Sequence, residues 1–402
     1  MQNLHIPFML LVGSGTNCSS STDNCNLTPN FAPEYIILEG TPGTDFGAFS
    51  YLQVTDPYGV PVAGASVTFT VTPSGSLTMN SAPSASGHPA CSPASSTSSI
   101  TCPTDQFGWV WLDVVLGSSV SQPSINYSAA GFAPDYFDVN IQAAPTISVT
   151  SAGVPGVVDA AADLTTIAPG SYVSIYGSGF TSALTGSSDE FGLVCNTTYC
   201  PYPLSFDDVS VSFDVPAATY PGFPYFVAAG QYPQVNLVVP WELEGQSSAQ
   251  VKVSFDALYG SELFSNVVTV PLATYVPAFF VSCGAACALD TNYKVISTGN
   301  PAKRGQYIQL YANGLGPVTN PPGDGVAATA SPLSYTTTTP VVTIGGAVVP
   351  AGNVQFSGLA PYYPALYQIN VLVPQSAQTG SAVPISLQIG GATTPAATIP
   401  VQ

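Results

Sequence analysis

The chain has 402 residues, of which 46% are hydrophobic and only 6% carry a charge, against about 25% in a typical globular protein. Its 4 Lys and Arg residues face 22 Asp and Glu residues, which gives a formal net charge of −18. So few cations exclude a nucleic-acid backbone or an anionic membrane surface as a partner. Gly and Pro, with 37 and 38 residues, interrupt every apolar run, so no membrane-spanning segment is expected.

The first element along the chain is an apolar N-terminal segment followed by a Gly-Ser-Gly-Thr-Asn linker. Its apolar residues alternate as in a β-strand. This strand could complete the first β-sandwich of its own chain, or it could be donated to a neighbouring copy by β-augmentation. Donation that does not close on itself generates a filament. The donor-strand face consists of Ile6, Phe8, Leu10 and Val12.

The next region, residues 31–144, alternates with period 2 and is broken by turns at roughly 8–12-residue spacing. Residues 51–71 read as two strands around an Asp56-Pro-Tyr-Gly turn, and residues 104–115 read as a Thr104-Asp-Gln-Phe-Gly turn followed by a strand. These two segments resemble the bacterial Ig-like modules of adhesins and invasins. The resemblance implies an Ig-like β-sandwich.

The remaining two-thirds of the chain contain an internal repeat. Residues 168–180 align with 303–315, and residues 231–240 align with 365–374. Each copy ends in two further predicted strands, 250–255 with 267–270 in the first copy and 383–389 with 397–401 in the second. Two units of about 125 residues with the same strand pattern predict two similar β-sandwiches in tandem.

This repeat resembles the uncharacterised C-terminal module of secreted proteins from soil acidobacteria, over about residues 165–402. The motifs that carry the resemblance include Ala168-Pro-Gly, Tyr176-Gly-Ser-Gly, Gln234-Val-Asn, Gly314-Leu-Gly-Pro and Tyr367-Gln-Ile-Asn. The resemblance implies export and an Ig-like fold, and it implies no known activity.

The predicted fold class is therefore all-β, with three tandem Ig-like β-sandwich domains after an N-terminal extended segment. We place the extended segment and its disulfide loop at residues 1–30. The three domains follow at residues 31–145, 146–272 and 273–402.

The eight cysteines form four close pairs, each within a loop rich in Ser, Thr, Asn and Pro. This spacing favours four local disulfides, and disulfides indicate an oxidising, extracellular compartment. The pairs are Cys18 with Cys25, Cys91 with Cys102, Cys195 with Cys200, and Cys283 with Cys287. Possible glycosylation acceptors in Asn-x-Ser/Thr sequences are Asn17, Asn26, Asn126 and Asn196.

The sequence offers little for catalysis, so we predict no enzyme activity and no cofactor. Its two histidines, His5 and His88, are not accompanied by a Gly-x-Ser-x-Gly nucleophile turn. The paired carboxylates lie beside turn residues, where acidic side chains normally face water. Calcium is the one cofactor that clustered loop carboxylates suit, with candidate loops at 189–190, 207–208 and 324.

Two stretches rich in Tyr and Pro precede the repeated strand. Their aromatic rings could stack on surface glycans or form a subunit contact. The packing interpretation, in which they cap the sandwich cores, is favoured. The residues concerned are Tyr220, Tyr225, Tyr232, Tyr362, Tyr363 and Tyr367.

The leading functional hypothesis is a structural subunit of an extracellular filament or pilus-like appendage. It would assemble head-to-tail with copies of itself by donating the N-terminal strand. The alternative is a monomeric cell-surface adhesin or carbohydrate-binding stalk, whose partners would be surface glycans.

Overall fold

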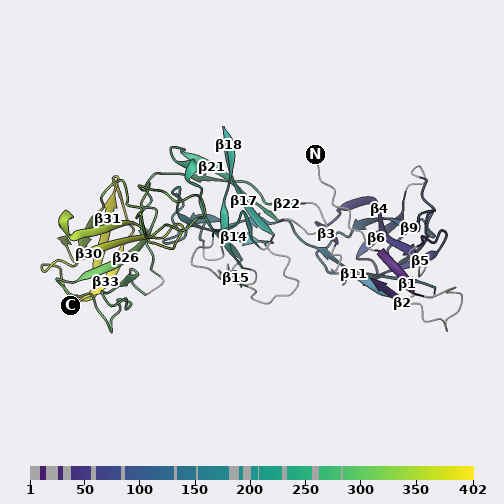
Figure 1. Cartoon of the computed structure of the whole chain (residues 1–402), viewed down its shortest axis with the longest axis horizontal. Helices are drawn as coiled ribbons and strands as arrows, with labels where there is room; N and C mark the ends of the chain where they lie inside the picture. The colour runs from purple at the N-terminus through teal and green to yellow at the C-terminus, as the bar shows by residue number, and fades with distance from the viewer. Residues whose placement is uncertain are drawn as a thin grey trace. The chain divides into compact units, whose positions relative to one another are not determined.

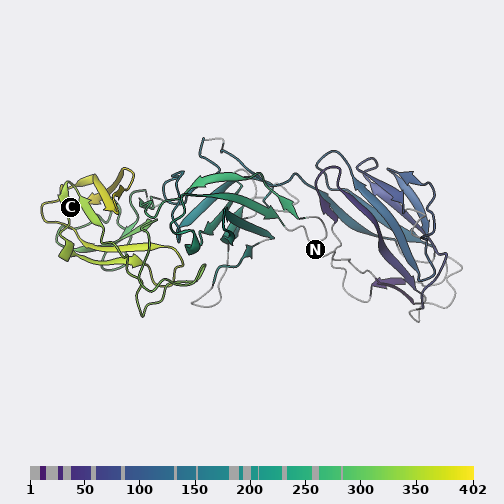
Figure 2. The ribbon, with the colours of Figure 1, turned by 90° about the horizontal axis from the view of Figure 1, so that it is seen from above.

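The structure is a computed structural model, and it is all-β (Figures 1 and 2). It divides into two compact units, Met1–Ala144 with Asp256–Leu263, and Pro145–Phe255 with Phe264–Gln402. None of the helices among the described residues is long and apolar enough to span a membrane. The described residues are 10–14, 26–29, 38–55, 60–82, 87–130, 134–150, 153–180, 190–192, 201–206, 208–228, 233–255, 262–281 and 284–402.

The first unit contains two sheets, and the predicted β-sandwich pattern is confirmed in its strands. Along β9, for example, Val110, Leu112 and Val114 are buried, whereas Trp109 and Trp111 lie on the outer face. One sheet has the order β2-β1-β4-β9-β6-β7, that is Asn26–Pro29, Leu10–Ser14, Asp45–Thr55, Trp109–Leu116, Leu77–Ser81 and Ser95–Ser96. The other has the order β3-β11-β10-β5-β8, that is Leu38–Gly40, Asp135–Ile141, Ser124–Ala129, Ser66–Thr72 and Ser99–Pro103.

The N-terminal strand β1 pairs with the edge of β4 that faces away from β9. Strand β3 directly precedes β4 in the chain, but it pairs in parallel with β11 in the other sheet. The edge of β4 opposite β9 is therefore covered by β1, which runs parallel to it with Leu10 opposite Gln53. In the single chain, residues 10–14 thus take the intramolecular alternative. Ile6 and Phe8 lie outside the described residues.

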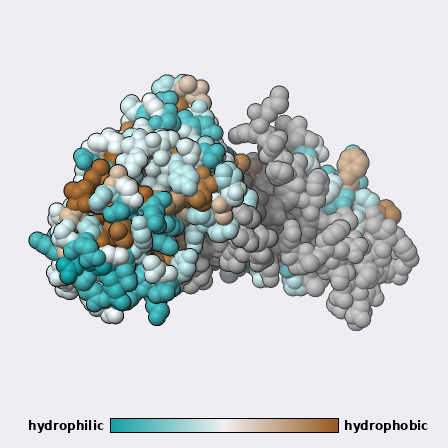
Figure 3. All heavy atoms as spheres, turned by 60° about the vertical axis from the view of Figure 1, so that its left-hand side comes forward, coloured by the Kyte–Doolittle hydropathy of each residue, from teal (hydrophilic) through white to brown (hydrophobic). Residues whose placement is uncertain are grey.

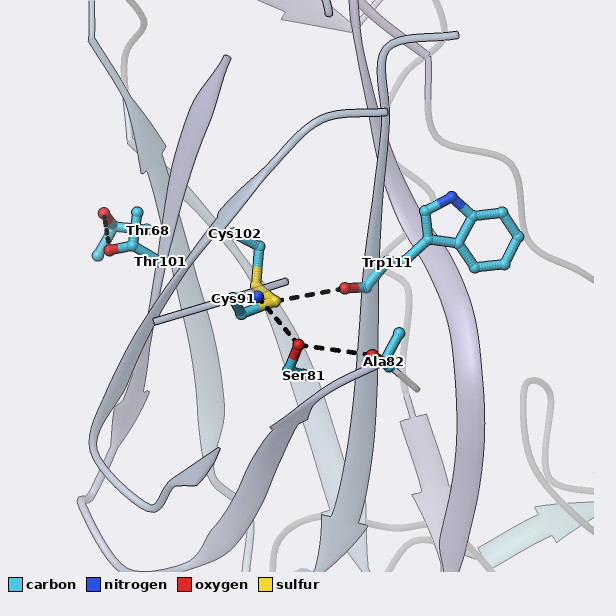
Figure 4. The surroundings of a disulfide bond; sticks show 7 residues. All are labelled: Thr68, Ser81, Ala82, Cys91, Thr101, Cys102 and Trp111. Atoms are coloured by element: carbon cyan, nitrogen blue, oxygen red, sulfur yellow. Dashed lines mark hydrogen bonds between the residues drawn. A yellow bond between two sulfur atoms is a disulfide. The ribbon is translucent and has the colours of Figure 1, made fainter. Parts of the chain in front are cut away.

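A buried disulfide connects Cys91 and Cys102 in the first unit, which confirms one predicted pair (Figure 4). Both cysteines belong to the hydrophobic core, and Cys102 lies on β8. Cys91 donates its backbone N–H to the Ser81 hydroxyl oxygen at 2.9 Å. This bridge is part of the core rather than a staple at a loop tip. The other three pairs stay predictions, because Cys18, Cys25, Cys195, Cys200 and Cys283 lie outside the described residues.

The second unit contains both sequence repeats, each built from two sheets. In the first repeat the sheets are β12-β14-β20-β19-β15 with β13, and β16-β17-β21-β22 with β18 and β23. Their bounds are Thr146–Ile147, Tyr172–Ser178, Gln234–Val238, Phe223–Ala228, Glu190–Gly192 and Val157–Asp159, then Ser205–Phe206, Val209–Val215, Ser248–Phe255, Leu263–Phe264, Ala218–Pro221 and Val268–Pro271.

The second repeat has a similar arrangement, but among the described residues each of its sheets has five strands instead of six, without counterparts of β15 and β16. Its sheets are β24-β26-β30-β29 with β25, and β28-β27-β31-β32 with β33. Their bounds are Ala278–Phe279, Tyr307–Asn313, Tyr367–Leu372, Val354–Leu359 and Ala288–Leu289, then Ala347–Val348, Val341–Ile344, Gly380–Ile389, Ala392–Thr393 and Ala397–Val401. Two short 3-10 helices occur, Trp241–Leu243 and Ala351–Asn353.

The strand registers confirm the repeat. Tyr172 lies opposite Val238 in the first repeat, and the aligned Tyr307 lies opposite Leu372 in the second. The predicted terminal strand pairs are also confirmed, as β21 with β23 and β31 with β33. A position in one repeat can therefore be compared directly with its counterpart in the other.

Replacing both Cys91 and Cys102 with Ser should lower the free energy of unfolding of the first unit by about 3 kcal/mol. The reason is that a bridge across 11 residues restricts the unfolded chain. Urea unfolding followed by hydrogen–deuterium exchange of β8 and β9 measures the change. Ser92→Ala, at an exposed neighbouring position, is the control. An unchanged double variant would contradict a core role for this bridge.

Candidate functional site

The residues that could carry catalysis or metal binding are dispersed. The His88 ring stacks on Trp111 with ring centroids 3.8 Å apart, and the Trp111 Nε1–H donates to Asp105. Among the described residues, no three His, Cys, Asp or Glu side chains come together as a metal site. Of the calcium candidates, Asp189 and Asp207 lie outside the described residues, and calcium binding stays a prediction.

The predicted aromatic residues separate into buried and exposed groups. Tyr367 is fully buried and donates its hydroxyl to the Gly316 carbonyl. Tyr225 stacks on Tyr202 with ring centroids 4.9 Å apart and meets Tyr172 edge-on at 5.4 Å. These three contacts are packing contacts, as the favoured interpretation expects. The remaining placements are Tyr220, which is partly buried, Tyr362 and Tyr363, which are half exposed, and Tyr232, which lies outside the described residues.

The possible glycosylation sites are not brought together. Asn126 lies within β10, between β5 and β11, and its amide donates to the Thr72 hydroxyl at 3.2 Å. Asn26 is described through its backbone only, and Asn17 and Asn196 lie outside the described residues. Glycosylation therefore stays a prediction.

The best-defined polar site lies where the two repeats meet, and it centres on Asn313. This side chain is fully buried at the end of β26 in the second repeat. Its Nδ2 donates to the Tyr172 carbonyl at 2.8 Å and to Asp159 Oδ2 at 2.5 Å, and its Oδ1 accepts the Tyr172 N–H at 2.9 Å. One carboxamide thus satisfies both backbone groups of a residue in the other repeat.

The Asp159 side chain also stabilises the turn that follows β13. Its Oδ1 accepts the backbone N–H groups of Ala161 and Ala162, at 3.0 and 2.8 Å. Burial raises the pKa of the Asp159 carboxyl, while the Asn313 hydrogen bond acts in the opposite direction. Because every described contact of this carboxyl is structural, the arrangement joins two repeats and does not resemble an acid–base pair.

Aromatic packing surrounds the polar contact. Trp241, from the first repeat, packs against the hydrophobic core of the second repeat. Phe223 approaches Gly325 so closely that a Cβ atom there would lie 2.8 Å from its ring, and Gly325 also has a positive φ of 64°. The backbone N–H of Tyr202 donates to the Gly325 carbonyl at 2.8 Å. The two repeats are therefore packed together rather than merely linked.

Asp324, a second carboxyl where the two repeats meet, has a raised pKa. Asp324 accepts the Trp241 backbone N–H at 2.9 Å. Burial, assisted by the neighbouring Glu242, raises the pKa of Asp324 to about 6. Ionising Asp324 therefore costs free energy, although the charged form still predominates at pH 7.

Sequence reasoning missed Asn313 as a key residue. The repeat alignment places it opposite Ser178, so one copy carries a carboxamide where the other carries a hydroxyl. That difference was the available signal. Its meaning depends on the packing of the two repeats, which the alignment does not contain.

No protein-family profile and no curated protein matches the chain. Similar solved structures include an endo-fucoidan hydrolase of glycoside hydrolase family 107, with 11% identity, 93% of this chain and 44% of that chain covered, and a TM-score of 0.22. A putative membrane-anchored protein from Corynebacterium diphtheriae is 11% identical, with 90% of this chain and 87% of that chain covered and a TM-score of 0.20. Invasin, a bacterial integrin-binding protein, is 15% identical, with 88% of this chain and 56% of that chain covered and a TM-score of 0.18.

The chain thus spans less than half of the hydrolase and just over half of invasin. Similarities this low do not assign a function, and none confirms the acidobacterial module. The class that the fold defines is an all-β protein of Ig-like β-sandwiches.

Asn313→Ala should lower the free energy of unfolding of the second unit by about 3 kcal/mol, because it removes one hydrogen bond from the buried Asp159 carboxyl and two from the buried backbone of Tyr172. Asn300→Ala is the matched control. Its amide donates to Asp290 at a partly exposed position, so its loss should cost below about 1 kcal/mol. Urea unfolding monitored by hydrogen exchange in β14 and β26 compares them. Equal effects would contradict a special role for Asn313.

Asp324→Asn should stabilise the second unit at pH 7 by up to about 1 kcal/mol, a figure reduced for partial solvent exposure. Because the folded pKa lies above the unfolded value, the wild-type chain loses stability as pH rises from about 4 to about 6. The advantage of Asn should therefore vanish near pH 4. Thermal unfolding across this range measures it.

Asp290→Asn is the control for that series. Hydrogen bonds to Asp290, led by the Lys294 backbone N–H, lower the pKa of its carboxyl. Asn at this position should therefore give no stabilisation at pH 7. If Asp324→Asn and Asp290→Asn changed stability with pH in the same way, the effect could not be assigned to the raised pKa of Asp324.

Proposed function

We propose that this chain is a non-enzymatic structural protein of the cell exterior, which polymerises by donating its N-terminal strand to another copy. The observation that supports this most is the edge of β4. The strand preceding β4 pairs in the other sheet, and the edge of β4 is instead covered by β1, whose Leu10 lies opposite Gln53, 43 positions further along the chain. An edge covered by a separate segment can accept the same segment from a neighbour.

The pairing between β1 and β4 supplies the chemistry of such a joint. Parallel main-chain pairing along residues 10–12 gives affinity, in a register that places Leu10 opposite Gln53 and Val12 opposite Thr55. The β1 strand also pairs with β2 on its other side, so it lies inside the sheet and not at its margin. Exchange between copies would replace an intramolecular pairing with an identical intermolecular one, at little cost in contacts.

The rest of the chain suits a load-bearing role. The Cys91–Cys102 bridge fixes the first core, and the Asn313 site joins the two repeats. Only 6% of the residues of the chain carry a charge, so most of its polar groups are uncharged. An extracellular disulfide-containing filament subunit would need these properties.

Exposed aromatic residues support a second candidate, a carbohydrate-binding adhesin. Tyr362 and Tyr363 are 48% and 51% exposed and adjacent, and Tyr362 has a positive φ of 75°. Exposed rings of this kind can stack on sugars. Glycan-array binding that Tyr363→Ala abolishes would favour this function over polymerisation.

Deleting residues 1–14 should abolish polymers, because it removes the strand that is donated. Sedimentation and electron microscopy of the purified, non-reduced protein measure the loss. A synthetic peptide of residues 1–14 in excess should also block polymerisation of the wild-type chain by occupying the β4 edge. This second test does not depend on how the shortened chain folds. Polymers that persist in both tests would contradict strand donation.

A further inference from the structure

The two repeats present equivalent ends, and among the described residues only one of these ends is covered by the other repeat. Val158 lies opposite Ser174 in the first repeat, and Leu289 lies opposite Gln309 in the second. Because Ser174 and Gln309 are aligned repeat positions, Asp290 is the counterpart of Asp159. The end of the first repeat around Asp159 is the one that receives Asn313.

In the second repeat this end is open and contains a pocket of about 100 Å³. Its walls include Asp290, Lys303, Gln306 and Tyr307, and Tyr307 is the counterpart of Tyr172. Asp290 accepts the backbone N–H groups of Asn292 and Lys294, at 2.8 and 3.0 Å, and the Asn300 amide at 3.0 Å. The turn that binds the next repeat in one copy is thus preserved and solvent-accessible in the other.

The side chains around this end have changed from apolar to polar and basic. Ala168 and Pro169 of the first repeat are replaced by Lys303 and Arg304, and Trp241 is replaced by Gln375. Arg304 Nη1 donates to the Gln375 carbonyl at 3.3 Å. In the part of the second unit that Figure 3 brings forward, hydrophobic residues form only small groups among hydrophilic ones. An apolar docking face has become a charged one.

We call Lys294, Lys303 and Arg304 the basic end: Lys303 lines the pocket, the Lys294 backbone N–H donates to Asp290 of the pocket wall, and Arg304 follows Lys303 in the chain. All three cations are exposed, and Lys294 belongs to the Asp290 turn. The chain has only four Lys and Arg residues, so three of them gather here. On a protein of net charge −18 this is a local reversal of sign. Such a reversal favours an acidic partner.

The first unit of another copy is an acidic part of the chain. Residues 1–144 contain no Lys or Arg. On neighbouring strands β4 and β9, Asp45 is exposed and Asp113 is partly buried. Burial, a side-chain hydrogen bond with Asp45 and the charge of Asp45 raise the pKa of Asp113, so the two carboxyls lie side by side and repel one another when both are ionised. A cation from another copy would relieve this repulsion.

We propose that the basic end of the second repeat binds the acidic first unit of another copy of this chain. This inference rests on the proposed self-assembly and adds a second, electrostatic contact to it. Contacts between exposed charges weaken with salt, since the screening length is about 8 Å at physiological ionic strength. The contact therefore guides and orients assembly, whereas the N-terminal strand holds the polymer together.

The test uses Lys303→Glu and the matched control Lys252→Glu in the full chain. Lys252 is the one cation outside the basic end. It lies on β21, with its Nζ 5.0 Å from the centroid of the Phe264 ring. Both variants change the net charge equally, so a difference between them reports position. Lys303→Glu should weaken self-association about tenfold at low salt, and less at high salt, whereas Lys252→Glu should change it less than about twofold.

Zero-length carbodiimide cross-linking of mixed light and heavy isotope-labelled chains identifies the contact directly. Cross-links from Lys294 or Lys303 to first-unit carboxyls of the other isotope support the proposal. Equal behaviour of the two Glu variants, or no such cross-links, would overturn it while leaving strand donation intact. Loss of polymers on deletion of residues 1–14, with the cross-links retained, would show the two contacts to be separate. A wild-type chain that never self-associates would overturn both.

Discussion

The buried hydrogen bonds of Asn313 are the interaction on which the second unit depends. A carboxamide placed at a strand end supplies both a donor and an acceptor to the backbone of Tyr172, and a second donor hydrogen to Asp159. Buried polar groups cost free energy unless they are paired, so these groups require the two repeats to remain in one arrangement. The apolar packing of Trp241 adds affinity, and the polar contacts fix the register.

The two repeats use the same turn at one end and surround it with different side chains. The first repeat has an apolar end that receives its neighbour, and the second has a polar end built on the same turn. A polar end of a repeat is compatible with exposure to water. Here the polar face also contains most of the cations of the chain. Solubility and recognition can therefore arise from the same substitutions.

Much of this fold follows from local sequence pattern. The alternation along β9 and the turn at Thr104 reflect interactions within a few residues. The two repeats could be recognised because their equivalent strands have similar sequences. The Cys91–Cys102 bridge was predictable because the two residues are close in sequence. The position of β1 was not predictable, since intramolecular and donated strands bury the same face.

The junction was beyond sequence reasoning for a different reason. Asn313 and Asp159 are 154 residues apart, and their importance depends on how two sandwiches dock. Tyr367 illustrates the same limit, because an aromatic residue in a Pro-rich stretch could be a ligand platform or a core residue. Only its burial and its bond to Gly316 identify it as part of the core.

The central claim, assembly through the N-terminal strand, is tested most directly by electron cryomicroscopy of the purified, non-reduced full chain at high concentration. The account predicts ordered filaments in which residues 10–14 of one copy run parallel to β4 of the next, in the register seen here within one chain. Well-separated single molecules, or filaments in which β1 remains in its own sheet, would contradict it.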